Sequence, residues 1–176
     1  MKKLSSIIIF LFLIFGISKS YAQDDFSKFD KDKQFNTVVV TQKMFEMMAN
    51  VKVAPTNEEE KAYFNLVKKL TSLKVYNTTD KTSKNNLKES VNSYSGKKGL
   101  KELANKNDTD SQVKILINKE GTEQNINELI MFNEGLSSTK ESIVLIINGS
   151  FSLKEIAALT KKMNLPLGDS LNKLSK

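Results

Sequence analysis

The chain contains no cysteine, histidine, tryptophan or arginine, and it has only two prolines and seven glycines among 176 residues. Without cysteine it can form no disulfide bond, and without cysteine and histidine it lacks the usual ligands of zinc and most other transition metals. The same absences exclude the serine–histidine and cysteine–histidine pairs that activate many nucleophiles. The glycines are scattered, so no glycine-rich phosphate loop is present. We therefore predict no metal, no cofactor and no enzymatic activity.

All 27 basic residues are lysine, and with 20 acidic residues they give a formal net charge of +7. Arginine supplies the bidentate hydrogen bonds with which many proteins read nucleic acids and clamp anions. We therefore expect this modestly basic, arginine-free chain not to bind nucleic acid. The lysines are expected to keep its surface soluble.

Residues 1–22 have the pattern of a secretory signal peptide. Lys2 and Lys3 form a basic start, Leu4–Ile17 is mostly apolar, and small residues precede a predicted cut between Ala22 and Gln23. The apolar run is too short to favour a membrane-spanning helix, although an uncleaved anchor is the alternative interpretation. Because no cysteine is present at the cut, we expect no lipoprotein. The predicted location is the periplasm or the cell exterior, with no transmembrane anchor after cleavage.

The remaining chain predicts one domain, since about 150 residues are enough to bury a core without disulfides. Residues 23–34 are polar and predict a flexible N-terminal arm or one short docked turn. Residues 35–167 are expected to form a single α+β domain, and residues 168–176 a loose C-terminal tail. The expected architecture is an antiparallel or mixed sheet of about five strands, with helices packed mainly on one face.

The first half of the domain alternates strand and helix patterns. Thr37–Val40 predicts a strand, and Thr41 can cap a helix whose core face has the spacing of Met44, Met47, Met48 and Val51. A second helix should start near Thr56 or Asn57 and bury Tyr63, Leu66, Val67 and Leu70. A short strand at Leu73–Tyr76, a polar helix at Lys81–Tyr94 and a short helical piece at Leu100 and Leu103 should follow.

The second half changes to a strand pattern. Three strands, at residues 112–118, Glu128–Phe132 and Ser142–Ile147, predict an antiparallel meander, and the run Ile143–Ile147 is apolar on both faces, which places it centrally. A last helix should begin at a capping box of Ser152 and Glu155.

Few residues have the pattern of a functional site. The methionines can be ordinary core, a soft copper(I) site, or the wall of a pocket for an apolar ligand such as an acyl chain; core packing fits their helical spacing best. Residues that would line such a pocket or core face are Met44, Phe45, Met48, Ile130 and Phe132.

Two further patterns in the sequence could support catalysis or cation binding. Serine–lysine pairs at S-x-x-K spacing occur at Ser95/Lys98, Ser137/Lys140 and Ser170/Lys173, about as often as chance predicts. Acidic clusters could serve a glycosidase or calcium, but solvated roles fit them better, and a loose cation site at Asn107, Asp108 and Asp110 is the remaining alternative.

Several segments resemble the family called domain of unknown function 4252, from cell envelopes of Bacteroidetes-type bacteria. The residues that carry the likeness are FNTVVVTQKMFEMMANV, YFNLVKKLTSLKVY, VKILINKEG, ELIMF and LTKKMNLP, which span Phe35–Pro166. Many members resemble lipoproteins with a cysteine after the signal peptide, which this chain lacks. The family has no assigned activity, so the resemblance implies an envelope protein but no site residues.

The leading hypothesis is an exported, non-catalytic envelope protein that binds a partner or ligand, in envelope homeostasis or signalling. One alternative is a carrier of an apolar ligand such as a lipid acyl chain. The other is a hydrolase that uses serine and lysine or carboxylates.

Overall fold

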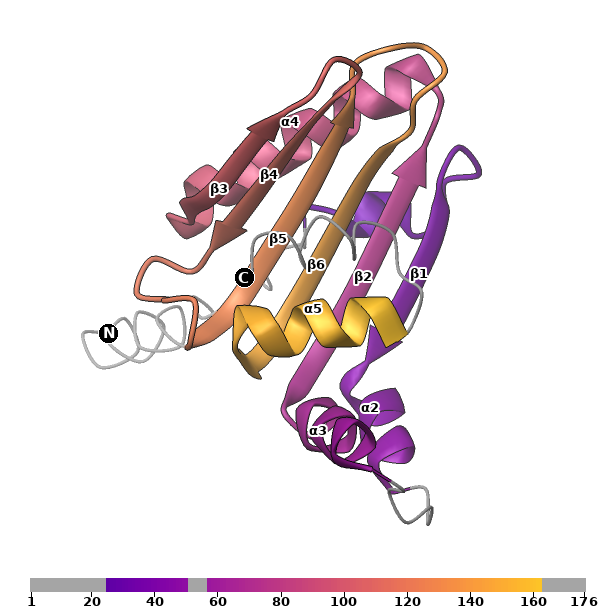
Figure 1. The fold of residues 1–176 in the computed structure, drawn as a ribbon. Coiled ribbons are helices and arrows are strands. Elements are labelled where there is room, and N and C mark those ends of the chain that lie inside the picture. The colour runs from indigo at the N-terminus through magenta and orange to yellow at the C-terminus, as the bar shows by residue number, and fades with distance from the viewer. Residues whose placement is uncertain (1–24, 51–56, 163–176) are drawn as a thin grey trace, which may run out of the picture.

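The computed structural model describes residues 25–50 and 57–162, which are built on a six-stranded antiparallel sheet (Figure 1). The strands are β1 (Asn36–Thr41), β2 (Leu70–Thr78), β3 (Lys101–Asn107), β4 (Ser111–Ile117), β5 (Ile126–Gly135) and β6 (Ser142–Phe151). Their order across the sheet is β1-β2-β6-β5-β4-β3. This confirms the predicted α+β class, with six strands rather than about five. The predicted signal peptide and C-terminal tail lie outside the described residues.

Strand β6 lies between β2 and β5, which confirms the central place predicted for it. The residues of its apolar run are all buried, and they alternate between the two faces of the sheet: Leu145 and Ile147 belong to one core cluster, Val144 and Ile146 to the other. A sheet with two apolar faces must be covered on both sides. The helices and the N-terminal segment provide that cover.

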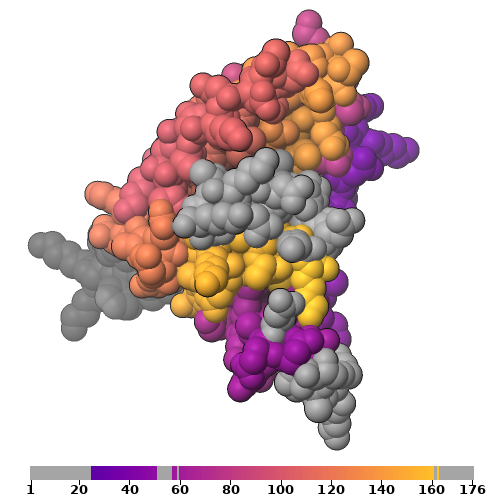
Figure 2. Space-filling model, in the orientation of Figure 1, coloured from indigo at the N-terminus to yellow at the C-terminus, as the bar shows by residue number. Residues whose placement is uncertain are grey.

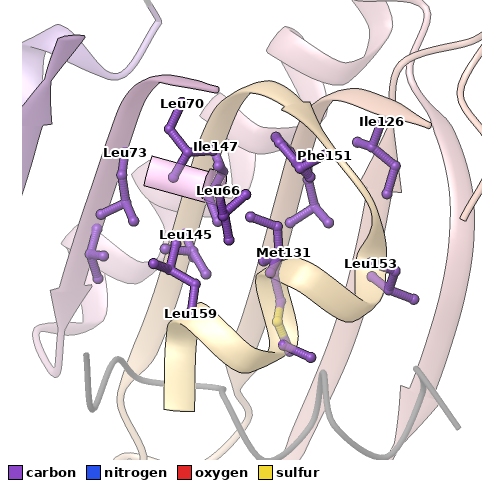
Figure 3. Packing of buried hydrophobic residues seen from close by; sticks show 14 of the residues in the cluster. Leu66, Leu70, Leu73, Ile126, Met131, Leu145, Ile147, Phe151, Leu153 and Leu159 are labelled. Atoms are coloured by element: carbon purple, nitrogen blue, oxygen red, sulfur yellow. The ribbon is translucent and has the colours of Figure 1, made fainter. Parts of the chain in front are cut away.

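Three helices cover the face that contains Leu145, here called the α5 face. They are α2 (Gln42–Ala49), α3 (Glu58–Val67) and α5 (Leu153–Lys162). Figure 3 shows Leu66 of α3 and Leu159 of α5 in one cluster with Leu145. Helix α5 crosses the strands, and Figure 2 shows it in yellow beside the purple atoms of α3.

The opposite face, here called the α4 face, is covered by α4 (Lys81–Lys98) and by the N-terminal segment. Leu87 and Val91 of α4 pack there. Three of the four α-helices that the structure describes therefore share one face, but α4, the longest, does not. Periodicity shows which side of a helix is buried, and it cannot show which face of a sheet receives that side.

Two forms were predicted for the N-terminal segment, a flexible arm or a short docked turn, and its described part forms the docked turn. A 3-10 turn, η1 (Ser27–Phe29), places Phe26 and Phe29 on the α4 face with exposures of 0% and 3%. The Phe26 ring stacks on Tyr76 of β2 at a centroid distance of 6.1 Å. The residues before β1 are thus part of the hydrophobic core.

Helix starts follow the predicted caps. Thr41 and Asn57 each accept a hydrogen bond from the backbone N–H three residues later, at 3.4 and 2.8 Å. Ser152 and Glu155 form the predicted reciprocal box, with Ser152 N donating to Glu155 Oε2 at 2.8 Å and Glu155 N to Ser152 Oγ at 3.2 Å. Asp80 caps α4 in the same way and was not predicted.

The short helical piece predicted at Leu100 and Leu103 is wrong, because this segment forms the edge strand β3. Gly99 ends α4 in the left-handed conformation, with φ of 61°, and the chain then pairs antiparallel with β4. A register shift between Glu102 and Ala104 brings both Leu103 and Ala104 against the α5-face core. The strand therefore lacks the period-two pattern by which strands are predicted.

Candidate functional site

The five residues predicted to line one apolar site lie in three different environments. Phe45 is buried and Met48 is half-buried on the α5 face, whereas Ile130 and Phe132 are buried on the α4 face. Met44 is exposed at the surface of α2. Because the sheet separates Phe45 and Met48 from Ile130 and Phe132, these residues line no common cavity.

Helix α2 is rotated from the predicted orientation. Its buried side consists of Phe45, with Met48 and Ala49 packed against the core, while Met44 and Met47 are 41% and 57% exposed. The buried residues Phe45 and Met48 have helical spacing, and so do the exposed Met44 and Met47. In a helix of eight residues, spacing alone therefore could not show which pair is buried. The aromatic ring buries more apolar area than a methionine side chain, and this favours the observed orientation. Val51 lies outside the described residues.

The exposed side of α2 therefore carries two apolar side chains. Met44 and Met47 are three residues apart, which places their side chains next to each other on one side of the helix. We call this pair the α2 outer face. Methionine is flexible and polarisable, and proteins that bind several partners use it at adaptable contact surfaces.

A pocket of about 250 Å³ lies where α2 meets the end of α3 and the start of β2. Its apolar walls include Phe45, Val67 and Leu70, and polar side chains of α2, among them Gln42 and Glu46, also line it. Those two are joined by a hydrogen bond of 3.0 Å. The pocket is smaller than the roughly 300–1,000 Å³ typical of ligand sites, and it involves neither methionine of the α2 outer face.

Two half-buried carboxylates have lowered pKa values because of hydrogen bonds that stabilise their charged form. The Lys97 ammonium, 2.9 Å from Asp25, is the main cause of the lowered pKa of that carboxyl. The backbone N–H of Ser83 lowers the pKa of Asp80 at the start of α4. Each shift is explained by an ion pair or a helix cap, and neither residue lines the pocket.

Glu155 and Tyr63 have shifted pKa values for other reasons. Burial would raise the pKa of Glu155, but hydrogen bonds from Lys69, at 2.7 Å, and from Ser152 outweigh it and lower the pKa. Burial raises the pKa of Tyr63. These residues also lie outside the pocket. The shifted groups of residues 25–50 and 57–162 thus hold the fold together rather than converge on a cleft.

The serine–lysine pairs do not form activated nucleophiles where the structure describes them. Lys140 Nζ lies 3.9 Å from Asp110 Oδ2, and Lys98 Nζ lies 5.6 Å from the ring centre of Tyr94. Both lysine side chains are exposed to solvent rather than enclosed in a cleft with the serine. The pair that ends at Lys173 lies outside the described residues.

The alternative cation site at Asn107, Asp108 and Asp110 forms the turn between β3 and β4. Asp108 Oδ1 accepts a hydrogen bond from the N–H of Thr109 at 2.8 Å, and all these residues are exposed. Across the described ranges, no group of three or more acidic side chains is placed to hold a metal ion.

Comparison with known proteins gives a family but no activity. Within the described residues, no helix is both long and apolar enough to span a membrane. No curated protein and no solved structure matches the chain. The family model described as "Domain of unknown function (DUF4252)" matches residues 28–159, from η1 into α5. The match covers all six described strands and confirms the resemblance found in the sequence, so the chain belongs to the DUF4252 family.

Proposed function

We propose that this protein is exported to the cell envelope and binds another protein there without catalysing a reaction. The observation that carries the proposal is the α2 outer face. Met44 and Met47 are 41% and 57% exposed on a helix that is anchored to the core by Phe45. A helix that packs against the core and presents two flexible apolar side chains to solvent offers a contact surface for the apolar side of a partner.

The titratable groups support a non-catalytic role. An enzyme without histidine or cysteine would need a lysine or carboxylate with a shifted pKa in a cleft. The pocket is lined by Glu46 and Lys68 as well as by Gln42 and Asn50, but the carboxylates with a shifted pKa lie outside it. Those carboxylates are helix caps and partners of lysines. The signal-peptide pattern of residues 1–22 supports the envelope location.

The alternative of an apolar-ligand carrier has less support. Ile130 and Phe132, which were to line its cavity, are 0% and 3% exposed and pack in the α4-face core with Leu87. The pocket on the other side of the sheet has a mixed lining and about 250 Å³, too little for a long acyl chain.

The test compares the proteins captured from an envelope extract by three forms of the tagged chain. The double variant Met44→Gln/Met47→Gln removes the apolar character of the α2 outer face and keeps good helix formers. The control Leu136→Gln changes a residue that is 56% exposed in the loop after β5. A protein retained by the wild type and the control, but lost from the double variant, is the expected result. Equal capture by all three forms would contradict the proposal.

A further inference from the structure

Within residues 25–50 and 57–162, strand β1 forms an edge of the sheet that lacks the usual features that prevent further pairing. Among the described strands it pairs only with β2, in an unbroken register from Asn36↔Asn77 to Thr41↔Ser72 (Figure 1). Its sequence, NTVVVT, contains no charge, no proline and no bulge. Val38 is 46% exposed there. An uncharged, β-branched edge strand is a template for another strand.

The opposite edge is protected in the ways that prevent pairing. Strand β3 carries Lys101, Glu102 and Lys106, all exposed, and its register with β4 shifts between Glu102 and Ala104. Charges and a bulge on an edge strand disfavour the addition of a further strand. A head-to-tail contact of β1 with β3 of the next molecule, which would continue into an open fibre, is therefore disfavoured.

We propose that β1 pairs antiparallel with β1 of a second copy of this chain, so that two six-stranded sheets join into one. A second copy suits this edge because the paired segments bring no like charges together. The first charged residues on either side of the strand are Lys33 and Lys43, beyond its ends. Cross-strand pairs of β-branched residues are favourable. The proposal goes beyond the proposed function, which concerns the α2 outer face.

Symmetry restricts the register of this pairing. The twofold axis that relates two antiparallel edge strands is perpendicular to the sheet and keeps each face on its own side. Side chains on the same face must therefore lie opposite each other, and one residue must lie opposite itself. Because β1 contains six residues, centring on Val38 or on Val39 pairs most of the strand. With the centre on Val38, that exposed side chain packs against its copy.

Such a dimer also places the α2 outer faces of its two copies apart from each other. Helix α2 follows β1 directly, and in antiparallel strands the two helices lie at opposite ends of the joined strands. The dimer would present two α2 outer faces and bind a partner with two matching sites by avidity.

The chain has no native cysteine, so single cysteine variants report the pairing without background. Directly opposite residues in antiparallel strands have Cα atoms about 4.5–5.5 Å apart, within the range of about 4.4–6.8 Å that a disulfide spans. The variants Val38→Cys and Val39→Cys are each produced as the full chain with its leader. Each purified variant is then treated with a mild oxidant. The control Asn105→Cys places the thiol on the β3 edge. One β1 variant is expected to give a disulfide-linked dimer, and the control is not.

Sedimentation velocity of the chain without cysteine gives an independent measurement. We expect a concentration-dependent dimer that Val38→Lys weakens by about tenfold or more, because a charge is placed on the paired edge. Val38→Thr keeps a β-branched, uncharged side chain and should retain the dimer. Circular dichroism checks that both variants are folded.

A wild-type chain that stays monomeric at high concentration, with no linkage at either β1 position, would overturn the pairing. Equal linkage of Asn105→Cys would overturn it as well, because contact would not be confined to β1. Failure here leaves the capture experiment on Met44 and Met47 unaffected, so the two proposals are tested separately.

Discussion

Tyr76 donates a hydrogen bond from its hydroxyl to Asp30 Oδ1 at 2.5 Å, across 46 positions of sequence. Tyr76 is fully buried in β2, and Asp30 follows the η1 turn, so this bond joins the N-terminal segment to the sheet. Phe26 stacks on the Tyr76 ring and meets Tyr94 of α4 at 5.4 Å between ring centres. The segment before β1 thus fills the space between α4 and the sheet.

Replacement of Phe26 by alanine should therefore lower the free energy of unfolding by about 3–5 kcal/mol, the usual cost of truncating a buried phenylalanine. The physical reason is the loss of a side chain that is 0% exposed and contacts three other rings. Urea denaturation followed by circular dichroism measures the change. Gln34→Ala, at an exposed position of the same segment, should change stability by less than about 0.5 kcal/mol. A Phe26→Ala variant as stable as this control would mean that the segment is not part of the core.

Local features of the sequence predicted the parts of the fold that depend on local physics. Thr41, Asn57 and the Ser152–Glu155 box begin helices because their side chains satisfy backbone N–H groups a few residues away. The run Ile143–Ile147 predicted a central strand because its apolar residues point to both faces. Each of these outcomes is decided within a few residues of the chain.

The parts that could not be predicted depend on contacts between distant segments. Leu103 is half-buried because β3 meets β4 with an irregular register, and no local pattern encodes that pairing. The face of the sheet that α4 covers is also decided by contacts between distant segments. For the candidate site, the sequence predicted a helix at the methionines but could not predict which of them are exposed. Phe45 and Met44 are neighbours in the chain, and only packing decides which side of α2 is buried.

Acid should weaken the start of α5 through Glu155. Its pKa is lowered in the folded state from an ordinary value of 4.5, so its charged form stabilises the fold above that pH. This contribution is lost as the pH falls through the lowered folded-state pKa. Glu155→Gln keeps a side-chain acceptor for the capping box and removes the charge that pairs with Lys69. The variant should be less stable than the wild type at pH 7, and the difference should shrink below pH 4.5.

Denaturant titrations at several pH values measure this difference. Glu120→Gln, at an exposed turn position, is the control and should follow the wild type at every pH. A gap between Glu155→Gln and the wild type that stays constant or widens on acidification would show that the charge of Glu155 does not stabilise the fold.

Export should remove the first 22 residues. The pattern before Gln23 fits the requirement of signal peptidase for small residues close to the cut, so the mature chain should begin at Gln23. N-terminal sequencing and intact mass of the protein from producing cells measure this. Ala22→Glu should block the cleavage, whereas Ala22→Gly should leave it intact. A wild-type chain that retains Met1 would contradict the prediction and favour the uncleaved anchor.

Gly149 in β6 should not tolerate a side chain. Its φ is +153°, and a Cβ placed there would lie 2.5 Å from the carbonyl oxygen of Lys69 and 2.9 Å from the Cα of Leu70. Both obstacles are backbone atoms, which cannot rotate away as a side chain can. Gly149→Ala should therefore lower the free energy of unfolding by about 1–3 kcal/mol, from backbone strain and overpacking.

Gly96 provides the matched control for the same substitution. It lies inside α4, and a Cβ there would meet nothing within 4 Å. Because alanine is the better helix former, Gly96→Ala should raise the free energy of unfolding by about 0.5–1 kcal/mol. Thermal and urea denaturation of the two variants should thus give shifts of opposite sign. If both variants shift in the same direction, the close approach of the start of β2 to β6 at Gly149 is not a constraint on the fold.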